Sequence, residues 1–338
     1  MRLHALQYLR AIAALAVVYS HTSIQVEGYS AFLKDVGSFG VDIFFVISGF
    51  IMIYIAKPDT QPGAFLNARI RRVVPLYWFF TLLMAGILVA MPNVFRSTIF
   101  EWDTFILSLT FVPHWSVAHD GYVWPIVAPG WSLIFEMYFY LLFAISLFFA
   151  QRYRIAFISV VITIVFIIGT LTHNGESALA QFFSKSMVFE FIFGMLLAVA
   201  FRRGMQIPSP TAWFMLILGF ALLLLELPFP RIFEYGVPSL MVVTACLYIR
   251  IGQYNWAVYL GDASYALYLS HIFTLGVLRK FVPPLLGDGA MAAYQFVAIS
   301  IVVCIIVSIF IHQYVDNWLL RRERLSFLGT QMPAPRKA

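Results

Sequence analysis

The segment LQYLRAIAALAVVYSHTS, residues 6–23, is apolar except for two residues that can carry charge, Arg10 and His21. An ionised side chain at the centre of a bilayer is costly, so such residues usually face a protein interior or a cavity. The two are eleven residues apart, three helical turns plus about 20°, so they share one face about 16 Å apart along the axis. This pattern predicts a narrow groove with a cation at one end and an imidazole at the other. Small side chains lie between them on that face: Ala14, Val17 and Val18.

An acidic residue, Asp42, lies a few positions inside the next apolar segment, GSFGVDIFFVISGF (residues 37–50), at the same expected depth as His21. A carboxylate beside a histidine can fix the tautomer of the imidazole and stabilise the imidazolium during proton transfer. The structural alternative is a carboxylate that the helix dipole favours in a first turn. We predict that Asp42 orients His21 as its catalytic partner.

Two arginines, Arg69 and Arg72, lie three residues apart in FLNARIRRVVPLYW (residues 65–78) and so share one helical face. A guanidinium can bind a phosphate group through two parallel hydrogen bonds. For any single arginine the alternative is membrane topology and contact with lipid headgroups. Because Arg10 enters the membrane from the same side, we predict that these three arginines bind a phosphate-bearing substrate.

The segment PGWSLIFEMYFYLLF (residues 129–143) places Ser132, Glu136 and Tyr140 four residues apart, so one face of an otherwise apolar helix is polar. A carboxylate inside a membrane is expensive without a partner. Glu136 is therefore predicted to pair with a histidine or an arginine, or to hold a substrate hydroxyl, in a catalytic role. Trp131 and Ser132 are predicted to contact the substrate. A purely structural buried pair is the alternative for Glu136.

A second polar stripe, formed by Ser264, Tyr268 and His271, occurs in LGDASYALYLSHIF (residues 260–273). We predict that Tyr268 and His271 contact the substrate, with a structural histidine between helices as an equal alternative. Glu190 is a further acid inside an apolar segment, and its role stays open.

These residues belong to a chain of 338 residues that is 62% hydrophobic and 11% charged. Soluble domains carry about 25% charged residues, so the composition is that of a membrane protein. We predict an all-α polytopic membrane protein with about ten transmembrane helices. The segment 101–113 is too short to cross and is expected at the interface or as a re-entrant piece. The expected spans are residues 5–25, 38–57, 73–91, 131–150, 155–171, 183–201, 211–227, 236–250, 258–278 and 290–313.

The net charge of +6 is explained by topology rather than by nucleic-acid binding. With both termini in the cytoplasm, fifteen of the 22 Lys and Arg residues fall on the cytoplasmic side and six outside, with Arg10 set aside inside the membrane. Such an excess of inner positive charge is the pattern that sets membrane orientation. We assign residues 1–325 to one transmembrane domain and 326–338 to a short cytoplasmic tail that we expect to be disordered.

The longest expected outer loop, residues 92–130, holds the aromatic stretch FVPHWSVAHDGYVWPIVAPG. It suits an ordered lid or an aromatic surface for a polar ligand, and equally an interfacial aromatic belt. His114, His119 and Asp120 lack any further ligand pattern, so we expect no metal site there.

In this order, the motifs resemble those of the acyltransferase-3 family of integral membrane proteins. The resemblance covers nearly the whole chain and rests on an ordered set whose members are weak alone. The set comprises LRAIAALAVVYSH, which fits the family's Arg-x10-His signature, GVDIFFVISGF, the R-x-x-R of RIRRVVP, WSLIFEMYFYL and LGDASYALYLSH.

The resemblance implies transfer of an acyl group, commonly acetyl or succinyl, from acyl-CoA to hydroxyls of cell-surface carbohydrates, of some lipids or of small molecules. It implies that His21 is the essential catalytic residue, that Arg10 is its motif partner, and that Arg69 and Arg72 contact CoA. Acyl-CoA is then a co-substrate, with no permanently bound cofactor, and the acceptor is a carbohydrate or a lipid-linked sugar. The implied location is the bacterial cytoplasmic (inner) membrane.

Two positions depart from the common family pattern, Gln7 and Ala11, where many members have an acid and a glycine. This form of the motif is similar to that of the exopolysaccharide-production (ExoZ-like) branch. The departure therefore puts the substrate in question rather than the chemistry.

The resemblance and the residue pattern combine in one mechanism. The groove from Arg10 to His21 would hold the pantetheine arm, and His21 would act as general base toward the acceptor hydroxyl. A covalent acyl-enzyme on His21 or a nearby serine stays open. The alternatives in other classes are a transporter or flippase of lipid-linked sugars and a non-catalytic scaffold. Partners beyond membrane lipids are also open, whether a second copy of the chain or a polysaccharide-assembly complex.

Overall fold

The protein is described by a computed structural model that covers residues 4–26, 28–29, 36–91, 99–225, 228–249, 252 and 254–319. Every regular element in these ranges is a helix, as the sequence predicts. Long apolar runs form helices in a membrane because a helix satisfies its own backbone hydrogen bonds. The first half contains α1 (His4–Ser23), α2 (Gly40–Ile55), α3 (Pro62–Ala90), α4 (Trp102–Leu109), α5 (Gly130–Ser146) and α6 (Gln151–Thr172). The second half contains α7 (Ala178–Phe183), η2 (Ser186–Phe189), α8 (Glu190–Arg202), α9 (Ser209–Leu223), η3 (Ile232–Gly236), α10 (Val237–Tyr248), α11 (Asn255–Asp262), α12 (Ser264–Phe281), α13 (Pro283–Leu286), α14 (Ala290–Ile311) and η4 (His312–Asp316).

Each of the ten predicted spans coincides with one helix or with consecutive helices. The third begins at Pro62 rather than at residue 73, because the arginine-rich segment before it is helical as well. The sixth is divided among α7, η2 and α8, and the ninth is divided at Ala263 between α11 and α12. The segment 101–113 contains the eight-residue helix α4, which is too short to cross a bilayer. The predicted tail, 326–338, lies outside the described residues.

Within the described ranges, three helical stretches are long and apolar enough to cross a membrane alone: Pro62–Ala90, Gln151–Thr172 and Ala290–Leu319. In the most apolar part of α6 only 17% of residues are buried, which leaves a broad apolar face of the kind that contacts lipid. The number ten and the orientation of the termini stay predictions. Shorter apolar helices occur at Gly40–Ile55, Gly130–Ser146, Ser209–Leu223 and Ile232–Tyr248.

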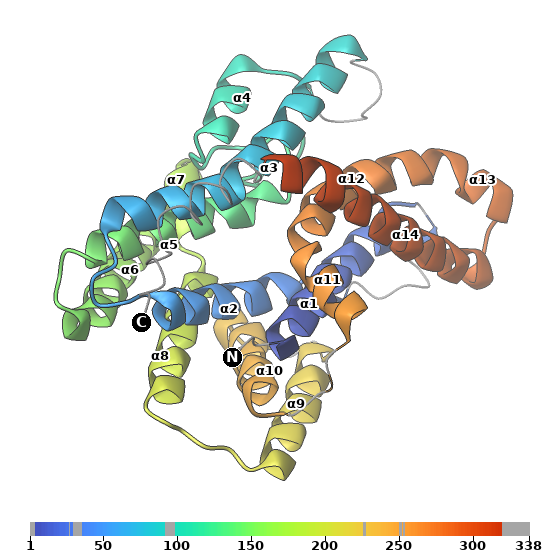
Figure 1. Cartoon of the computed structure of the whole chain (residues 1–338). Coiled ribbons are helices and arrows are strands. Elements are labelled where there is room, and N and C mark those ends of the chain that lie inside the picture. The colour runs from blue at the N-terminus through green and yellow to red at the C-terminus, as the bar shows by residue number, and fades with distance from the viewer. Residues whose placement is uncertain are drawn as a thin grey trace, which may run out of the picture.

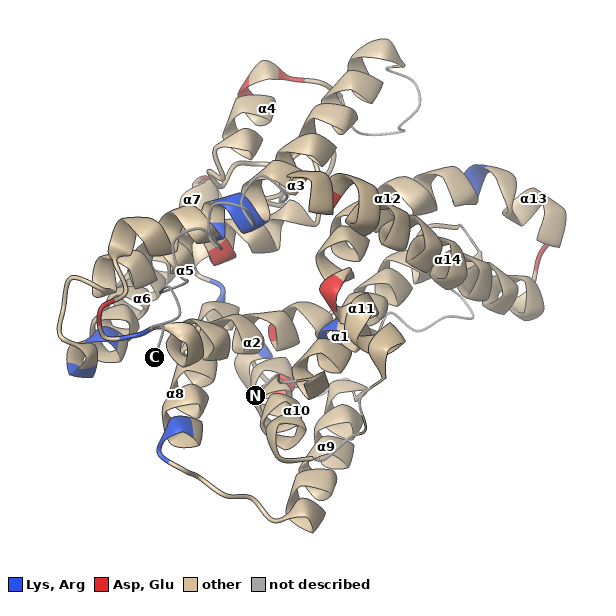
Figure 2. Cartoon of the chain, in the orientation of Figure 1, with Lys and Arg blue, Asp and Glu red and all other residues tan. Residues whose placement is uncertain are grey.

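Helix α2 lies in the middle of the helical assembly (Figure 1), where it packs against α1, α5, α8 and α10. Helix α1 contacts α2 on one side and α11, α12 and α14 on the other. The long α3 packs against α5 and α12. Charged residues are sparse along these helices (Figure 2). This arrangement brings α1, α2, α3, α5 and α12 around one interior region.

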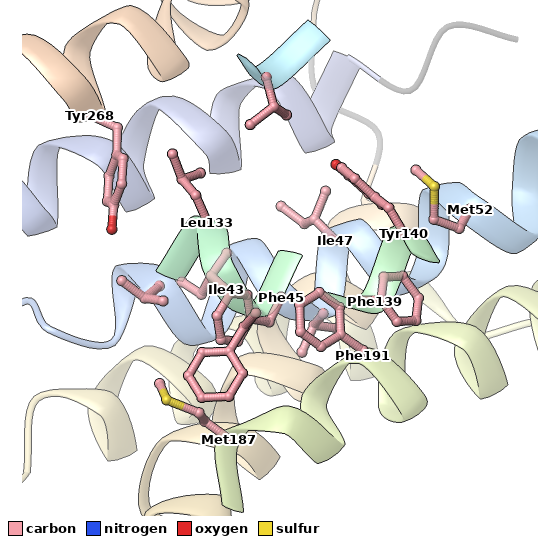
Figure 3. Close-up of a cluster of buried hydrophobic side chains, with 14 of the residues drawn as sticks. Ile43, Phe45, Ile47, Met52, Leu133, Phe139, Tyr140, Met187, Phe191 and Tyr268 are labelled. Carbon is pink, nitrogen blue, oxygen red and sulfur yellow. The ribbon is translucent and has the colours of Figure 1, made fainter. Parts of the chain in front are cut away.

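Aromatic rings hold α2, α5 and α8 together (Figure 3). The ring of Phe191 stacks on Phe45 with centroids 4.5 Å apart and on Phe139 with centroids 4.3 Å apart. All three side chains are buried. Such ring pairs contribute about 0.5–1.5 kcal/mol beyond the free energy gained by burying their apolar area. This stack therefore fixes α2 between α5 and α8.

Two glycines allow α2 and α8 to cross at very short range. A Cβ atom at Gly49 would lie 2.0 Å from the carbonyl oxygen of Phe191, and one at Gly194 would lie 2.0 Å from the carbonyl oxygen of Val46. Small residues permit this kind of backbone contact between membrane helices. The crossing therefore depends on the absence of side chains at these two positions.

Candidate active site

A polar cavity of about 150 Å³ lies where α1, α2, α3, α5 and α12 meet. Ligand clefts usually enclose about 300–1,000 Å³, so this cavity has room for one end of a ligand and not for a whole coenzyme. Its polar lining combines six predicted site residues with four others: Arg10, Arg69, Arg72, Ser132, Glu136, Tyr268, Ser48, Tyr140, Ser264 and Tyr265.

Positive charge is in excess in this lining. Three arginines, Arg10, Arg69 and Arg72, line the cavity together with a single acid, Glu136. Their side chains come from α1, α3 and α5, which the chain places close together although they are distant in sequence. The Nε atom of Arg69 is buried without a hydrogen-bond partner among the described residues. A buried donor of this kind is costly when it stays unsatisfied, and its chemistry suits an anion or an acceptor-rich group.

Arg10 is positioned through a chain of side-chain hydrogen bonds. Its Nη1 donates to Oε1 of Gln7 over 3.1 Å, and Nε2 of Gln7 donates to Oδ1 of Asp262 over 2.9 Å. The backbone of Gln7 lies so close to α11 that a Cβ at Gly261 would be 2.2 Å from its carbonyl oxygen. Gln7 occupies the position where an acid is common in the resembling family. Here Asp262, on a different helix, supplies that acid through the amide.

Glu136 is held by hydroxyl groups rather than by a histidine. Ser48 donates to its Oε1 over 3.1 Å, and the hydroxyl of Tyr140 donates to the same oxygen. The carboxylate also interacts electrostatically with Arg10. Glu136 thus interacts with an arginine through charge alone. Its direct hydrogen bonds come from hydroxyl groups of α2 and α5.

At the far end of the cavity a second hydroxyl pair joins α5 to α12. The Ser132 and Tyr268 oxygens are 2.7 Å apart, and both residues hydrogen-bond to the carbonyl of Pro129. The hydroxyl of Tyr265, one helical position from Ser264, donates to the carbonyl of Val73 on α3 over 2.6 Å. Helix α12 is therefore tied to both α3 and α5 at the wall of the cavity.

The two predicted histidines contact each other beside this hydroxyl pair. The rings of His21 and His271 meet edge to face with centroids 4.8 Å apart, and His271 is 6.1 Å from the ring of Tyr268. His271 is fully buried and His21 is partly exposed. Among the described residues His21 does not line the polar cavity itself; Tyr268 and His271 connect the two.

The tautomer of His21 is set by its own helix. Its Nδ1 lies 2.9 Å from the carbonyl oxygen of Val17. A carbonyl only accepts hydrogen bonds, so Nδ1 carries the proton in the neutral ring and Nε2 presents the lone pair. This is the state that a general base requires, and the i−4 carbonyl provides it.

Asp42 has a different partner from the one predicted. Both of its carboxylate oxygens accept hydrogen bonds from Arg231, at 3.2 Å from Nε and 2.7 Å from Nη2. A Cβ at Gly40, two residues before Asp42, would lie 2.2 Å from the carbonyl of Ala13, so α2 meets α1 about two turns from His21. The expectation that Asp42 lies at the depth of His21 is therefore wrong. Asp42, Arg231 and the fully buried Glu190, which interacts electrostatically with both, are called the acid–arginine cluster below.

The remaining predicted substrate contact, Trp131, lies outside the polar cavity. The ammonium of Lys185 sits over its ring at 5.4 Å. In the loop before α5, the rings of Tyr122 and Trp124 lie 4.3 Å apart and His119 is 5.1 Å from Trp124. These three rings form one aromatic cluster, and its role as a ligand surface or an interfacial belt stays a prediction.

The loop histidines contact protein groups. Burial lowers the pKa of His114, whose Nδ1 lies 2.8 Å from the carbonyl of Val112. In the part of the chain that the structure describes, no three His, Cys, Asp or Glu residues gather in a way that could hold a metal ion.

Comparison with known proteins identifies the family of this chain. The family model described as acyltransferase domain matches residues 3–312. The chain belongs to the acyltransferase-3 family. This acyltransferase is 33% identical over 299 residues to the exopolysaccharide production protein ExoZ of Rhizobium meliloti (strain 1021), covering 86% of this chain and 91% of that relative. It is 24% identical to the acyltransferase MdmB of Streptomyces mycarofaciens, covering 98% of this chain and 94% of that one.

No solved structure matches this acyltransferase. The family is integral to the membrane, in agreement with the apolar helices described above, and the chain falls in its ExoZ-like branch. The cavity of the acyltransferase contains polar residues that the sequence analysis did not select, namely Ser48 and Tyr265. A signal existed for Ser48, which is the single serine in the apolar helix α2.

Proposed function

We propose that the protein is an O-acyltransferase that moves an acetyl or succinyl group from cytoplasmic acyl-CoA to a hydroxyl of a cell-surface or exopolysaccharide sugar. The observation that carries this proposal is the excess of three arginines over one acid in a cavity that leads, through Tyr268 and His271, to a histidine in the base form. The alternative, a transporter or flippase of lipid-linked sugars, predicts no affinity for CoA.

The donor would bind with its phosphates at Arg69 and Arg72 and its thin arm in the cavity. Guanidinium groups suit phosphate oxygens, and the free Nε of Arg69 offers one further donor. The cavity volume of about 150 Å³ suits the end of the arm, so the nucleotide would remain at the cavity mouth on the arginine side. Acyl-CoA is thus a co-substrate, and no permanently bound cofactor is part of the proposal.

His21 would act as the general base. Its Nε2 takes the proton from the acceptor hydroxyl as that oxygen attacks the thioester carbonyl carbon. The carbon–sulfur bond breaks, and the leaving thiolate takes the proton from the imidazolium, which returns His21 to its starting state. Glu136, held by Ser48 and Tyr140, would stabilise positive charge on Arg10 and keep it directed at the donor.

The acceptor would approach from the side opposite the arginines. The name of the ExoZ relative supports an exopolysaccharide acceptor, and the cluster of Tyr122, Trp124 and His119 offers aromatic faces of the type that stack on sugar rings. The side of the protein that carries Arg69 and Arg72 has the excess of positive charge. This supports the placement of that side in the cytoplasm of a bacterium. Tyr268, Ser132 and His271 would line the acceptor's path to His21.

The test is acyl transfer from radiolabelled acetyl-CoA or succinyl-CoA in membranes of a polysaccharide-producing host that lacks its own enzyme. The variants are His21→Ala, the double change Arg69→Ala with Arg72→Ala, and His173→Ala. His173 is exposed in the loop after α6 and serves as the matched histidine control.

We expect label in polysaccharide with the wild type and with His173→Ala, and none with the other two at equal protein levels. Label with His21→Ala would reject the general-base mechanism. Label with all four proteins would reject the proposed function as a whole.

A further inference from the structure

A second cavity, of about 510 Å³, opens between the ends of α2, α6 and α8. We call it the basic cavity because four arginines line it, two from the start of α6 and two from the end of α8. Figure 2 shows basic residues at these two helix ends. The acyl-transfer mechanism uses none of them. The arginines are Arg152, Arg154, Arg202 and Arg203.

The lining of the basic cavity contains no acidic residue among those described. Arg154 is almost fully buried and donates to backbone carbonyls of Phe149, Lys57 and Pro58 over 3.3–3.5 Å. Arg202 donates to the carbonyl of Ile53 over 3.0 Å. Carbonyl partners orient a guanidinium without neutralising its charge. The cavity therefore keeps a strong positive field that calls for an anion.

The position of two of these arginines is unfavourable for an isolated helix. Arg152 and Arg154 lie in the first turn of α6, where the helix dipole disfavours cations. No side chain caps this N-terminus, since Ala150 occupies the capping position. The start of the 22-residue α6, whose N–H groups no side chain caps, thus adds to the field of the four arginines. An anion bound between the four arginines and the start of α6 interacts favourably with the charge of the arginines and with the helix dipole.

Apart from the four arginines and Gln151, the wall of the basic cavity is apolar. The apolar part consists of Ile53, Ala56, Phe143, Ile155 and Val199. Four arginines beside an apolar wall match a molecule with an anionic head and a hydrocarbon chain. Basic pockets between membrane helices at the interface are a recognised setting for anionic phospholipid headgroups.

We propose that the basic cavity binds the phosphate headgroup of an anionic phospholipid, with the acyl chain against the apolar wall. The donor nucleotide is the other source of phosphate near this end of the protein. It is disfavoured because the two cavities share no lining residue, and the basic cavity is lined from the ends of α2, α6 and α8 rather than from α1, α3 and α12. The inference is independent of the acyl donor.

The experiment measures lipid binding to the purified full-length protein by native mass spectrometry. The probes are phosphatidylglycerol and cardiolipin, with phosphatidylcholine as the zwitterionic comparison. The double variant is Arg152→Gln with Arg203→Gln, because both side chains are exposed and their loss leaves the buried contacts of Arg154 intact. The matched control, Arg279→Gln with Lys280→Gln, removes two charges from the end of α12.

We expect the double variant to bind both anionic lipids at least tenfold more weakly than the wild type does. The control variant should bind these lipids as the wild type does, and CoA binding should be unchanged. Equal lipid binding by wild type and double variant would overturn the proposal. Displacement of the lipid by excess CoA would also overturn it, by assigning the cavity to the nucleotide.

A second measurement on the unaltered protein keeps the proposal testable if the double variant does not fold. A photoactivatable phosphatidylglycerol is expected to label peptides that contain residues 151–155 and 199–203. Labelling confined to other peptides would contradict the proposal. The Arg69→Gln and Arg72→Gln double variant should label normally, which separates this site from the acyl-donor cavity.

Discussion

Two groups of charged side chains are enclosed by the same apolar helices, and they are organised in opposite ways. In the acid–arginine cluster, Asp42 is fully buried and both of its oxygens are bound by Arg231, while Glu190 adds a second acid whose oxygens have no hydrogen-bond partner among the described residues. In the polar cavity, three arginines share one acid and space remains between them. Charges that satisfy one another stabilise the fold, and charges left in excess around a cavity are available to a ligand. Direct pairing of opposite charges therefore distinguishes structure from function here better than depth does.

The largest effect is expected from breaking the pair of Asp42 and Arg231. Arg231→Gln leaves the buried carboxylate of Asp42 without its cation, which should cost about 3 kcal/mol, the lower end of the range for a broken buried pair, because Arg231 is 33% exposed. The measurement is thermal unfolding in detergent followed by a thiol-reactive dye, since Cys246 and Cys304 are both buried and free. The double change Asp42→Asn with Arg231→Gln should recover much of the lost stability. An unchanged melting temperature in the single variant would show that the cluster is not structural.

A smaller effect, and of a different kind, is expected from the group with excess charge. Arg72→Gln should weaken donor binding by about 2 kcal/mol, the contribution of a charged hydrogen bond, which is about thirtyfold in affinity. The melting temperature should stay within about 2 °C, because no acid in the lining loses its only partner. KM for the acyl donor and the melting curve are measured on one preparation. A large fall in stability without a change in KM would remove the distinction between the two groups.

The hydrogen-bond chain from Asp262 through Gln7 to Arg10 is expected to affect donor binding only by positioning the guanidinium of Arg10. Gln7→Ala removes the link between Arg10 and Asp262 and should raise the donor KM about fivefold, which corresponds to about 1 kcal/mol for a neutral hydrogen bond. The double change Gln7→Glu with Asp262→Asn keeps one acid and one amide in this series of hydrogen bonds. It should return the donor KM to the wild-type value. Failure of the double change to improve on Gln7→Glu alone would argue that the two side chains are not coupled.

The smallest effect is expected outside both groups. Trp124→Ala removes the central ring of the loop cluster and should raise the acceptor KM about threefold, in line with about 0.5–1 kcal/mol for an aromatic contact. The donor KM should not change, because the polar cavity does not include this loop. An equal rise in both constants would indicate a general disturbance of the fold instead of an acceptor contact.

Patterns within one helix were sufficient to predict part of this site. The four-residue spacing of Ser132, Glu136 and Tyr140 and the three-residue spacing of Arg69 and Arg72 placed these side chains on single faces, and the structure brings those faces to one cavity. The helical segments were predictable for the same reason, since apolar length is a local property of the sequence.

Contacts between distant helices were not predictable in this way. Asp42 was assigned to His21 because both were expected at similar depth, but the close crossing at Gly40 and Ala13 shifts α2 along α1. Arg231, its actual partner, is 189 residues away in the chain. A sequence pattern records which face a residue is on, and helix packing decides which face it meets.

The most direct test of this account is equilibrium binding of unacylated CoA to the purified protein by isothermal titration calorimetry. The wild type is compared with Arg69→Gln plus Arg72→Gln, and with Asp42→Asn plus Arg231→Gln. The account predicts that the first double variant loses at least tenfold in affinity and that the second binds CoA as the wild type does. Wild-type affinity in the first variant, or a loss confined to the second, would contradict the claim that the unbalanced arginines hold the donor.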